Sequence, residues 1–474
     1  MSNPLPYDKA ISWLHRNSGE GVFISNTNIK EYPEVTGYLI PTLLEWGEHD
    51  LARKFALYLV KTQNDDGSWN DPTGGNPYTF DTGQCLHGLL EIHPRMPALY
   101  GAIEKAAHCL ESHTDMQTGQ LKAYDESVWT KDMSRKIHLL CAKPLMDAAV
   151  VCMEGSYGGA ANHLFDFHTK DPDPKLSHFA MYCVEAAIEY APAWQNKNLA
   201  LPWPIRGDGM VYSYNPEHLL KFAFRKSGWS CLPAQFQYAK CAYMAGMAAK
   251  GRLALNWGMK YQQKDGGFLG CTPGGNYFPE EEVSWAVKYF LDAYQWMMKR
   301  EFASHARVDL SLYDGRLVAL KEEIPKNCGS LLDAGCGKGR YLLRVDADRK
   351  VGIDISPENV RMTPYAVEMS LLNITLKEKF DCIYCIEALE HSIRPEIAIK
   401  EMCDHLNPGG KIIIIDKNME FLGRMTMPVW EQWFNANKVC EWLERYCTDV
   451  TVLEIGYEDK QPDGLFLMWT GVKK

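Results

Sequence analysis

The sequence lacks the segments that would place it in a membrane or mark it for export. None of its 474 residues belongs to an uninterrupted apolar stretch of about 20, the length that crosses a bilayer. Residues 1–8 contain neither a basic segment nor an apolar core, so no signal peptide is expected. We therefore expect a cytoplasmic protein without a membrane span.

Basic runs and a disulfide framework are also absent. The formal net charge is −10, which argues against nucleic acid as a partner. The 15 cysteines are scattered and several lie in apolar segments, which is typical of reduced core thiols. Cys382 and Cys385 form a CxxC pair, but the pair lies inside an apolar run and no second pair completes a zinc site. No metal site is predicted.

Residues 5–300 show the periodicity of apolar residues that is typical of helices. Apolar residues recur at spacings of three and four, as at Leu51, Phe55 and Leu59, and Gly- and Asn-containing turns separate the segments. The predicted helices span 7–16, 38–46, 51–62, 82–92, 99–113, 178–190, 234–248, 252–262 and 282–299.

A turn motif recurs within this helical half. Residues 63–69 read QNDDGSW and residues 263–268 read QKDGGF, and a GGN segment follows each of them. A weaker copy, DMQTGQ, lies at 115–120. Repeated helix pairs predict a stacked or closed α/α architecture.

The pattern changes after about residue 301. Strand-like apolar runs then alternate with helical segments, which predicts a doubly wound sheet whose last two strands form a hairpin. The predicted strands are 330–334, 350–355, 380–386, 411–416, 450–455 and 465–472. The predicted helices are 340–345, 357–362, 394–406 and 430–446.

A glycine-rich segment joins the first of these strands to the next predicted helix. Residues 331–340 read LLDAGCGKGR, and glycines here let the backbone turn tightly and approach a ligand. The next strand ends near Asp354, whose carboxylate can accept the ribose hydroxyls of a nucleoside cofactor. The strand at 380–386 runs into an EALEH segment, residues 387–391.

This ordered set resembles the class I S-adenosylmethionine-dependent methyltransferases, and most of all the O-methyltransferases of ubiquinone biosynthesis. The resemblance implies a Rossmann-like α/β domain with a seven-stranded sheet and S-adenosylmethionine as the cofactor. The residues it assigns to the cofactor are Asp333, Ala334, Gly335, Cys336, Gly337, Gly339, Asp354, Ile355, Asn373 and Glu387. Asn373 departs from the family pattern, which has an acid after the third strand, but its amide oxygen can accept the same hydrogen bond from adenine.

Catalysis of methyl transfer requires an in-line approach and, for a hydroxyl acceptor, a base. His391 is the candidate base, since an unperturbed imidazole has a pKa of about 6.5; alternatively, it packs against or caps the next helix. Glu387 is expected to face the cofactor or the acceptor. Residues 417–432, rich in Met, Phe and Trp, form either an acceptor wall or an ordinary connection.

The helical half resembles the α/α toroids of squalene–hopene cyclases and prenyltransferases, and also those of uronyl epimerases and polysaccharide lyases. Segments 229–235 (WSCLPAQ) and 283–293 (VSWAVKYFLDA) resemble a bacterial branch linked to surface polysaccharide biosynthesis. The DxDD segment of triterpene cyclases is absent, which disfavours that reaction. Tyr78 and Asp81, near a predicted helix start, are candidates for proton transfer.

The sequence thus predicts a multidomain enzyme, with an all-α toroid at 1–302 and a methyltransferase domain at 303–474. The expected reaction is O-methylation of a glycan, a sugar nucleotide or another small hydroxylated acceptor that the toroid binds. The alternative is a bifunctional enzyme whose toroid resembles a uronic-acid epimerase or lyase, or a terpenoid cyclase. The sequence carries no signal for an oligomeric state.

Overall fold

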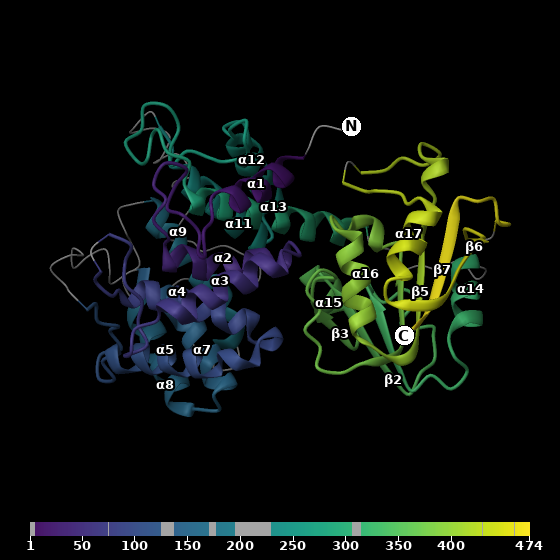
Figure 1. Cartoon of the computed structure of the whole chain (residues 1–474), viewed down its shortest axis with the longest axis horizontal. Coiled ribbons are helices and arrows are strands. Elements are labelled where there is room, and N and C mark those ends of the chain that lie inside the picture. Colours follow the sequence, from purple (N-terminus) through teal and green to yellow (C-terminus); the bar gives the residue numbers. More distant parts are fainter. Residues whose placement is uncertain are drawn as a thin grey trace. The chain divides into compact units, whose positions relative to one another are not determined.

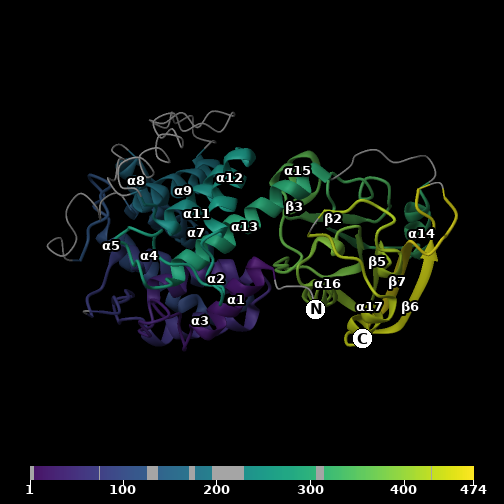
Figure 2. The same ribbon diagram turned by 90° about the horizontal axis from the view of Figure 1, so that it is seen from above.

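The computed structural model shows a chain that folds as two compact units (Figure 1, Figure 2). The helical unit comprises Met1–Leu43 and Glu48–Met298, and the sheet unit comprises Leu44–Gly47 and Lys299–Lys474. The structure describes residues 5–73, 75–124, 137–169, 177–194, 229–305, 314–428, 430–458 and 460–474.

The regular elements described in the helical unit are helices. They are α1 (Pro6–Arg16), α2 (Pro33–Glu45), α3 (His49–Thr62), α4 (Thr79–Ile92), α5 (Tyr100–His113), α7 (Ala142–Val151), α8 (Gly155–His168), α9 (Ser177–Trp194), α11 (Leu232–Met244), α12 (Ala248–Met259) and α13 (Ser284–His305). The nine predicted helices each have a counterpart, whereas α7 and α8 were not predicted. Helix α8 begins GSYGG, and glycine has a low helix propensity, so packing rather than local preference stabilises its start.

In each copy of the repeated turn, a glycine packs against the backbone of a helix. Gly67, Gly119 and Gly266 have φ angles of +91°, +84° and +109°, and a side chain at any of them would overlap a backbone carbonyl of α5, α8 or α1, respectively. The turn that follows α12 therefore packs against the first helix. Gln262 Nε2 also donates to the carbonyl oxygen of Pro6 at 2.8 Å. The two ends of the helical unit lie side by side, while its description as a toroid stays a prediction.

The sheet unit contains a seven-stranded sheet in the order β3-β2-β1-β4-β5-β7-β6. Strands β1 to β5 are parallel, and β7 is antiparallel to both β5 and β6. Strand bounds are β1 (Ser330–Ala334), β2 (Arg349–Asp354), β3 (Ala366–Glu368), β4 (Phe380–Ile386), β5 (Leu406–Lys417), β6 (Cys447–Ile455) and β7 (Phe466–Lys473). The seven-stranded Rossmann-like sheet expected from the sequence is confirmed.

Helices cover both faces of this sheet. Apolar residues of α16 (Pro395–Asp404) and α17 (Ala436–Leu443) pack in one hydrophobic cluster, and those of α14 (Gly315–Glu323) pack in another. The short helix α15 (Pro357–Met362) follows β2. Burial of these apolar faces fixes the strand ends, and therefore the candidate site, in place.

Three local predictions differ from the structure. The helix predicted at 340–345 is wrong, because this segment forms successive turns after Gly339, whose φ of +78° a helix cannot include. The helix predicted at 430–446 is shorter, since α17 begins only after Asn435, whose side chain accepts from Lys438 N. Strand β3 was not predicted as a strand, because its three mostly exposed residues leave no apolar run.

Candidate functional site

The carboxyl ends of the parallel strands gather the predicted residues at one edge of the sheet. Asp333 is the last residue but one of β1, Asp354 ends β2, Glu387 follows β4, and Lys417 ends β5. Because β1 lies between β2 and β4, and β5 lies beside β4, these ends are neighbours. This is the edge at which open α/β sheets bind ligands.

The glycine-rich segment links the first two strands to the turn that follows β4. Gly335 has a φ of +85°, and a side chain there would overlap the methyl group of Ala388. The backbone N–H groups of Gly335 and Cys336 donate to the carbonyl oxygen of Ile353 at 2.8 and 2.9 Å. The absence of a side chain at Gly335 therefore brings the candidate catalytic turn against the glycine-rich segment.

Asp354 holds this glycine-rich segment in place. One carboxylate oxygen accepts from Gly337 N at 2.9 Å, and the other accepts from Ser356 N at 2.8 Å and from Asn359 Nδ2 at 3.1 Å. Burial raises the pKa of this carboxyl. A carboxylate offers about four lone-pair positions, so these three bonds leave about one for a ribose hydroxyl.

Asp333 is a second buried carboxyl at this edge. It accepts a hydrogen bond from the Tyr384 hydroxyl at 2.8 Å. Burial, followed by the nearby charge of Asp354, raises the pKa of Asp333 to about 7. Its charge therefore changes close to neutral pH.

The adenine side of the predicted site contains two possible acceptors. Asn373 lies in a tight turn and donates its N–H to the carbonyl oxygen of Ser370 at 3.1 Å. Glu368, which sequence reasoning missed, ends β3 directly beside Asp354 in the strand register. Ile355 is partly buried immediately after β2.

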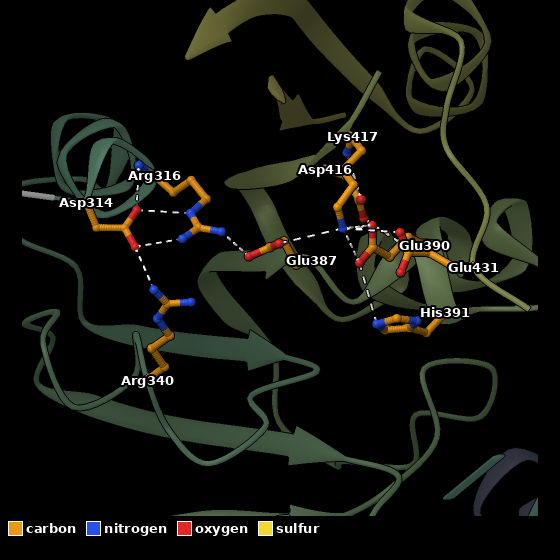
Figure 3. Close-up of polar contacts among 9 residues, drawn as sticks. All are labelled: Asp314, Arg316, Arg340, Glu387, Glu390, His391, Asp416, Lys417 and Glu431. Atoms are coloured by element: carbon orange, nitrogen blue, oxygen red, sulfur yellow. Dashed lines mark hydrogen bonds and ion pairs between the residues drawn. The ribbon is translucent and has the colours of Figure 1, made fainter. Parts of the chain in front are cut away.

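Glu387 occupies the centre of a series of alternating charges (Figure 3). Its backbone has a φ of +48°, and its N–H donates to Ile415 O at 2.9 Å. Its carboxylate accepts from Arg316 and lies 3.6 Å from Lys417 Nζ. A strained backbone held in this way is frequent at functional sites.

Asp314 extends this series on the other side of Arg316. It accepts from Arg316 N, Nε and Nη2 at 3.0, 3.0 and 2.9 Å, and from Arg340 Nη2 at 3.0 Å. Although burial opposes the shift, the bonds from Arg316 hold the pKa of Asp314 below its usual range. Arg340 Nε is buried and has no hydrogen-bond partner among the described residues, so it can serve an anionic ligand group.

Lys417 lies among three glutamates on the other side of Glu387. Its Nζ is 2.6 and 2.5 Å from the two oxygens of Glu390, and 3.4 Å from Glu431. Burial and then the charge of Asp416 raise the pKa of Glu390, whose N–H donates to Asp416 Oδ2 at 3.0 Å. The pKa of the Glu390 carboxyl therefore lies above the usual carboxyl range.

His391 is placed beside this cluster. Its Nε2 lies 3.5 Å from Glu390 Oε1, and its ring stacks on Phe302 with ring centroids 5.1 Å apart. Glu390, His391 and Glu431 offer ligand atoms within 4.8 Å of one another, a spacing that a metal ion can use. The ammonium group of Lys417 already forms ion pairs with both glutamates.

The two remaining candidates belong to the helical unit. Tyr78 precedes the first residue of α4, and Asp81 is buried in its first turn. Burial, followed by the charge of Glu34, raises the pKa of Asp81 well above its usual value. Sequence reasoning missed several charged residues of the sheet unit: Asp314, Arg316, Arg340, Asp416, Lys417 and Glu431. The signal for one pair was available, since Asp416 and Lys417 directly follow four isoleucines.

Comparison with known families decides the class of the sheet unit. Residues 302–447 match the model of a family described as a methyltransferase domain. These residues are a methyltransferase domain. It is of the S-adenosylmethionine-dependent class, and S-adenosylmethionine is its cofactor.

The curated relatives match part of this chain. Ubiquinone biosynthesis O-methyltransferase of Coxiella burnetii is 30% identical over 119 residues, which cover 22% of this chain and 51% of the relative. The chain thus spans about half the length of the curated relatives it matches.

Solved structures related to the methyltransferase domain are more distant in sequence. A possible histamine N-methyltransferase from Thermotoga maritima is 19% identical, with 38% of this chain and 94% of that chain covered and a TM-score of 0.30. The N-methyltransferase NodS from Bradyrhizobium japonicum, in complex with S-adenosyl-L-homocysteine, is 18% identical, with coverages of 37% and 87% and a TM-score of 0.28. Within the described ranges, no helix combines the length and apolarity needed to cross a membrane.

Proposed function

We propose that the chain transfers a methyl group from S-adenosylmethionine to a hydroxyl oxygen of a glycan, a sugar nucleotide or another small hydroxylated acceptor, which the helical unit binds. One observation carries the proposal. The turn holding Glu387, Glu390 and His391 packs directly against the glycine-rich segment, through Ala388 and Gly335. A base on this turn is therefore close to the proposed cofactor site.

The cofactor supplies an electrophilic methyl group, and this chain holds and orients it. The proposed binding residues are Asp333, Ala334, Gly335, Cys336, Gly337, Gly339, Asp354, Ile355, Asn373 and Glu387. Arg340 joins this set, because its buried Nε is a donor suited to the carboxylate of the methionine moiety.

His391 is the proposed general base. As the acceptor oxygen bonds to the methyl group, its hydroxyl proton becomes acidic and the imidazole can take it. Glu390, 3.5 Å from His391 Nε2, would stabilise the resulting imidazolium, and the stacked ring of Phe302 restricts the imidazole plane. The alternative is that His391 only packs against its neighbours and takes no part in proton transfer, and the kcat of a His391 variant distinguishes the two roles.

The segment after β5 is the proposed acceptor wall. Two backbone hydrogen bonds join the start of this segment to the residues that follow it. They run from Phe434 N to Lys417 O and from Met419 N to Phe434 O, and both are 2.9 Å long. Glu431 attaches the segment to Lys417, and Trp433 Nε1 donates to Glu431 Oε1 at 2.8 Å. These contacts support an anchored wall beside the proposed base.

The helical unit is proposed to bind the acceptor as an α/α toroid. The repeated glycine turns and the packing of the last repeat on α1 support a closed ring of helices. The raised pKa of Asp81 favours a proton donor over a base at this position. It thus gives little support to a uronate epimerase or lyase that would start with proton abstraction by Asp81.

A methyl-transfer assay on the full chain tests the proposal. The chain would be incubated with methyl-labelled S-adenosylmethionine and a panel of nucleotide sugars and oligosaccharides, and products would be analysed by mass spectrometry and linkage analysis. We expect an O-methylated sugar. Labelled products that carry the methyl group only on nitrogen would refute the oxygen assignment.

The same assay tests His391. We expect His391→Ala to lower kcat by about 10²- to 10⁴-fold with little change in KM for S-adenosylmethionine. His405→Ala is the matched control, because His405 lies at the end of α16, where its Nδ1 is bonded to the carbonyl oxygen of Glu401, and it should retain kcat. Equal activity of both variants would assign His391 a packing role.

A further inference from the structure

Five helices of the helical unit present buried polar side chains at helical spacing. Residues three, four or seven apart lie on one face of a helix, so each helix carries a polar stripe. We call these residues the polar core: Glu34, Tyr38 and Thr42 of α2; Asp81 and Gln84 of α4; His178, Tyr182 and Glu185 of α9; Gln237 and Lys240 of α11; Lys288, Tyr289 and Asp292 of α13.

Ion pairs and hydrogen bonds show that these stripes meet. Lys240 Nζ bonds to Glu185 and lies 3.3 Å from Asp292, and Lys288 Nζ lies 2.8 Å from the same Asp292 oxygen. These pairs join α9, α11 and α13. Thr42 Oγ1 donates to Asp292 Oδ1 at 2.6 Å, which adds α2 to the group.

Two further contacts complete the polar core. His178 Nδ1 and Gln237 Oε1 are 2.5 Å apart, between α9 and α11. Helix α4 packs against α2, since a Cβ added to Gly37 of α2 would overlap the backbone of Gln84 and Cys85 in α4.

Four polar atoms of this core lack a hydrogen-bond partner among the described residues. They are Asp81 Oδ2, Gln84 Nε2, Glu185 Oε2 and Gln237 Nε2. Their side chains belong to residues only 1, 2, 4 and 0% exposed, respectively. A buried polar group left unpaired costs about 1–3 kcal/mol, and native proteins contain few of them. Four such atoms on helix faces that meet can each form a hydrogen bond with a ligand.

We propose that the polar core binds a neutral polyhydroxylated ligand of the sugar class. The four unpartnered atoms are two amide nitrogens, which donate hydrogen bonds, and two carboxyl oxygens. Neighbouring hydroxyl groups of a sugar can both accept from the amides and donate to the carboxyl oxygens. Both lysines already contact carboxylates, so little positive charge remains for a phosphate. An apolar ligand would leave all four atoms unpaired.

The aromatic rings of the polar core fit the same ligand class. The rings of Tyr182 and Tyr289 have centroids 6.1 Å apart, and the Tyr182 ring lies 4.7 Å from that of His178. Aromatic faces pack well against the C–H faces of sugars, and such sites combine apolar walls with a few polar groups. This inference rests on the proposed function in one respect, namely that the helical unit holds the acceptor, but ligand binding is measurable without methyl transfer.

Gln84→Met in the full chain separates a ligand site from a structural role. Removing an unpaired buried donor should raise the Tm of the ligand-free chain by about 2 °C, as expected for roughly 1 kcal/mol in a unit of this size. Leu86→Met is the matched control, since it lies on another face of α4 and conserves volume. A Tm of Gln84→Met clearly below that of the control would overturn the proposal, because it would mean that Gln84 stabilises the fold.

Thermal shifts with named probes test the ligand class. Glucose and maltotriose, which are neutral, would be compared with inorganic phosphate and farnesol. We expect at least one sugar to raise the Tm of the wild type and of Leu86→Met, and to have no effect on Gln84→Met. The proposal is overturned if no sugar raises the wild-type Tm, if the shift persists in Gln84→Met, or if phosphate or farnesol gives the larger shift.

The methyl-transfer assay on the same variants distinguishes the two proposals. Sugar binding that depends on Gln84, without any methylated sugar, would support the polar core as a sugar site and refute the glycan acceptor. Methylation of a sugar that is unchanged in Gln84→Met would support the methyltransferase proposal and overturn this one.

Discussion

The two units bury lysines among carboxylates in different ways. Lys417 lies at the end of a parallel strand, and its partners come from the turn after the neighbouring strand and from the segment that follows its own. Lys240 lies within a helix, and its partners come from two other helices. In the sheet, the order of the strands places the charged residues next to one another. In the helical unit, the charged residues meet only because the faces of separate helices pack together.

The two clusters also differ in how completely their carboxylates are paired. Both oxygens of Glu390 contact Lys417, whereas Glu185 has one oxygen paired with Lys240 and another without a partner among the described residues. We infer that the first cluster positions neighbouring groups and that the second is built to receive a ligand. The predictions below test this contrast.

The largest effect is expected from Lys417→Met. This change leaves Glu390 and Glu387 without their shared cation, and breaking a buried ion pair costs about 3–5 kcal/mol. The free energy of unfolding, from denaturant titration, is the measurement. The control is Arg349→Met, which removes an exposed ion pair with Glu378, and exposed ion pairs contribute little to stability. Similar losses in the two variants would show that the Lys417 cluster is not a buried network.

A pH-dependent effect is expected from Asp333→Asn. Because the pKa of Asp333 is raised to about 7, the folded chain holds a proton that the unfolded chain releases near pH 4. Wild-type stability therefore falls as pH rises between these values, and asparagine removes this loss. At pH 8 we expect the ligand-free variant to be the more stable by at most about 4 kcal/mol, at about 1.4 kcal/mol per pKa unit, and the two to converge near pH 4.

Unfolding of both proteins across this pH range is the measurement for Asp333. A stability difference that does not change with pH would contradict the raised pKa. The test also bears on the helical unit, because burial raises the pKa of Asp81 in the polar core as it raises the pKa of Asp333.

A smaller effect is expected from Gly266→Ala. At this position an added Cβ both adopts a φ of +109° and overlaps the backbone of α1. Gly75→Ala is the control, since Gly75 has a φ of +71° with open space around it. We expect the first variant to lose about 1–3 kcal/mol more than the second, the usual range for overpacking, as measured by thermal unfolding. Equal losses would refute the packing of the last repeat against the first helix.

Sequence patterns predicted the sheet well because its signals are contiguous. The strands at 330–334 and 380–386 were predicted to the residue, and the glycine-rich segment carries glycines that its backbone conformation requires. The segment after Gly339 was wrongly predicted as a helix, since local periodicity says nothing about a positive φ just before it. Strand β3 was too short and exposed to leave a pattern.

The charged partners of the site could not be predicted in the same way. Asp314 and Arg316 reach Glu387 only because α14 covers one face of the sheet. The polar core is harder still, since its residues come from five helices between positions 34 and 292 and share no motif. Their burial is visible only once the helices are packed.

The central claim, that S-adenosylmethionine binds at the edge organised by the glycine-rich segment, is tested most directly by calorimetric titration of the full chain with this cofactor. We predict saturable binding by the wild type and a loss of roughly 100-fold in affinity in Asp354→Ala, since the three bonds that hold the segment include charge-assisted bonds worth about 1.5–3 kcal/mol. Glu378→Ala, which removes an exposed carboxylate on the same unit, should bind like the wild type. Unchanged affinity in Asp354→Ala, or no binding by the wild type, would contradict the account.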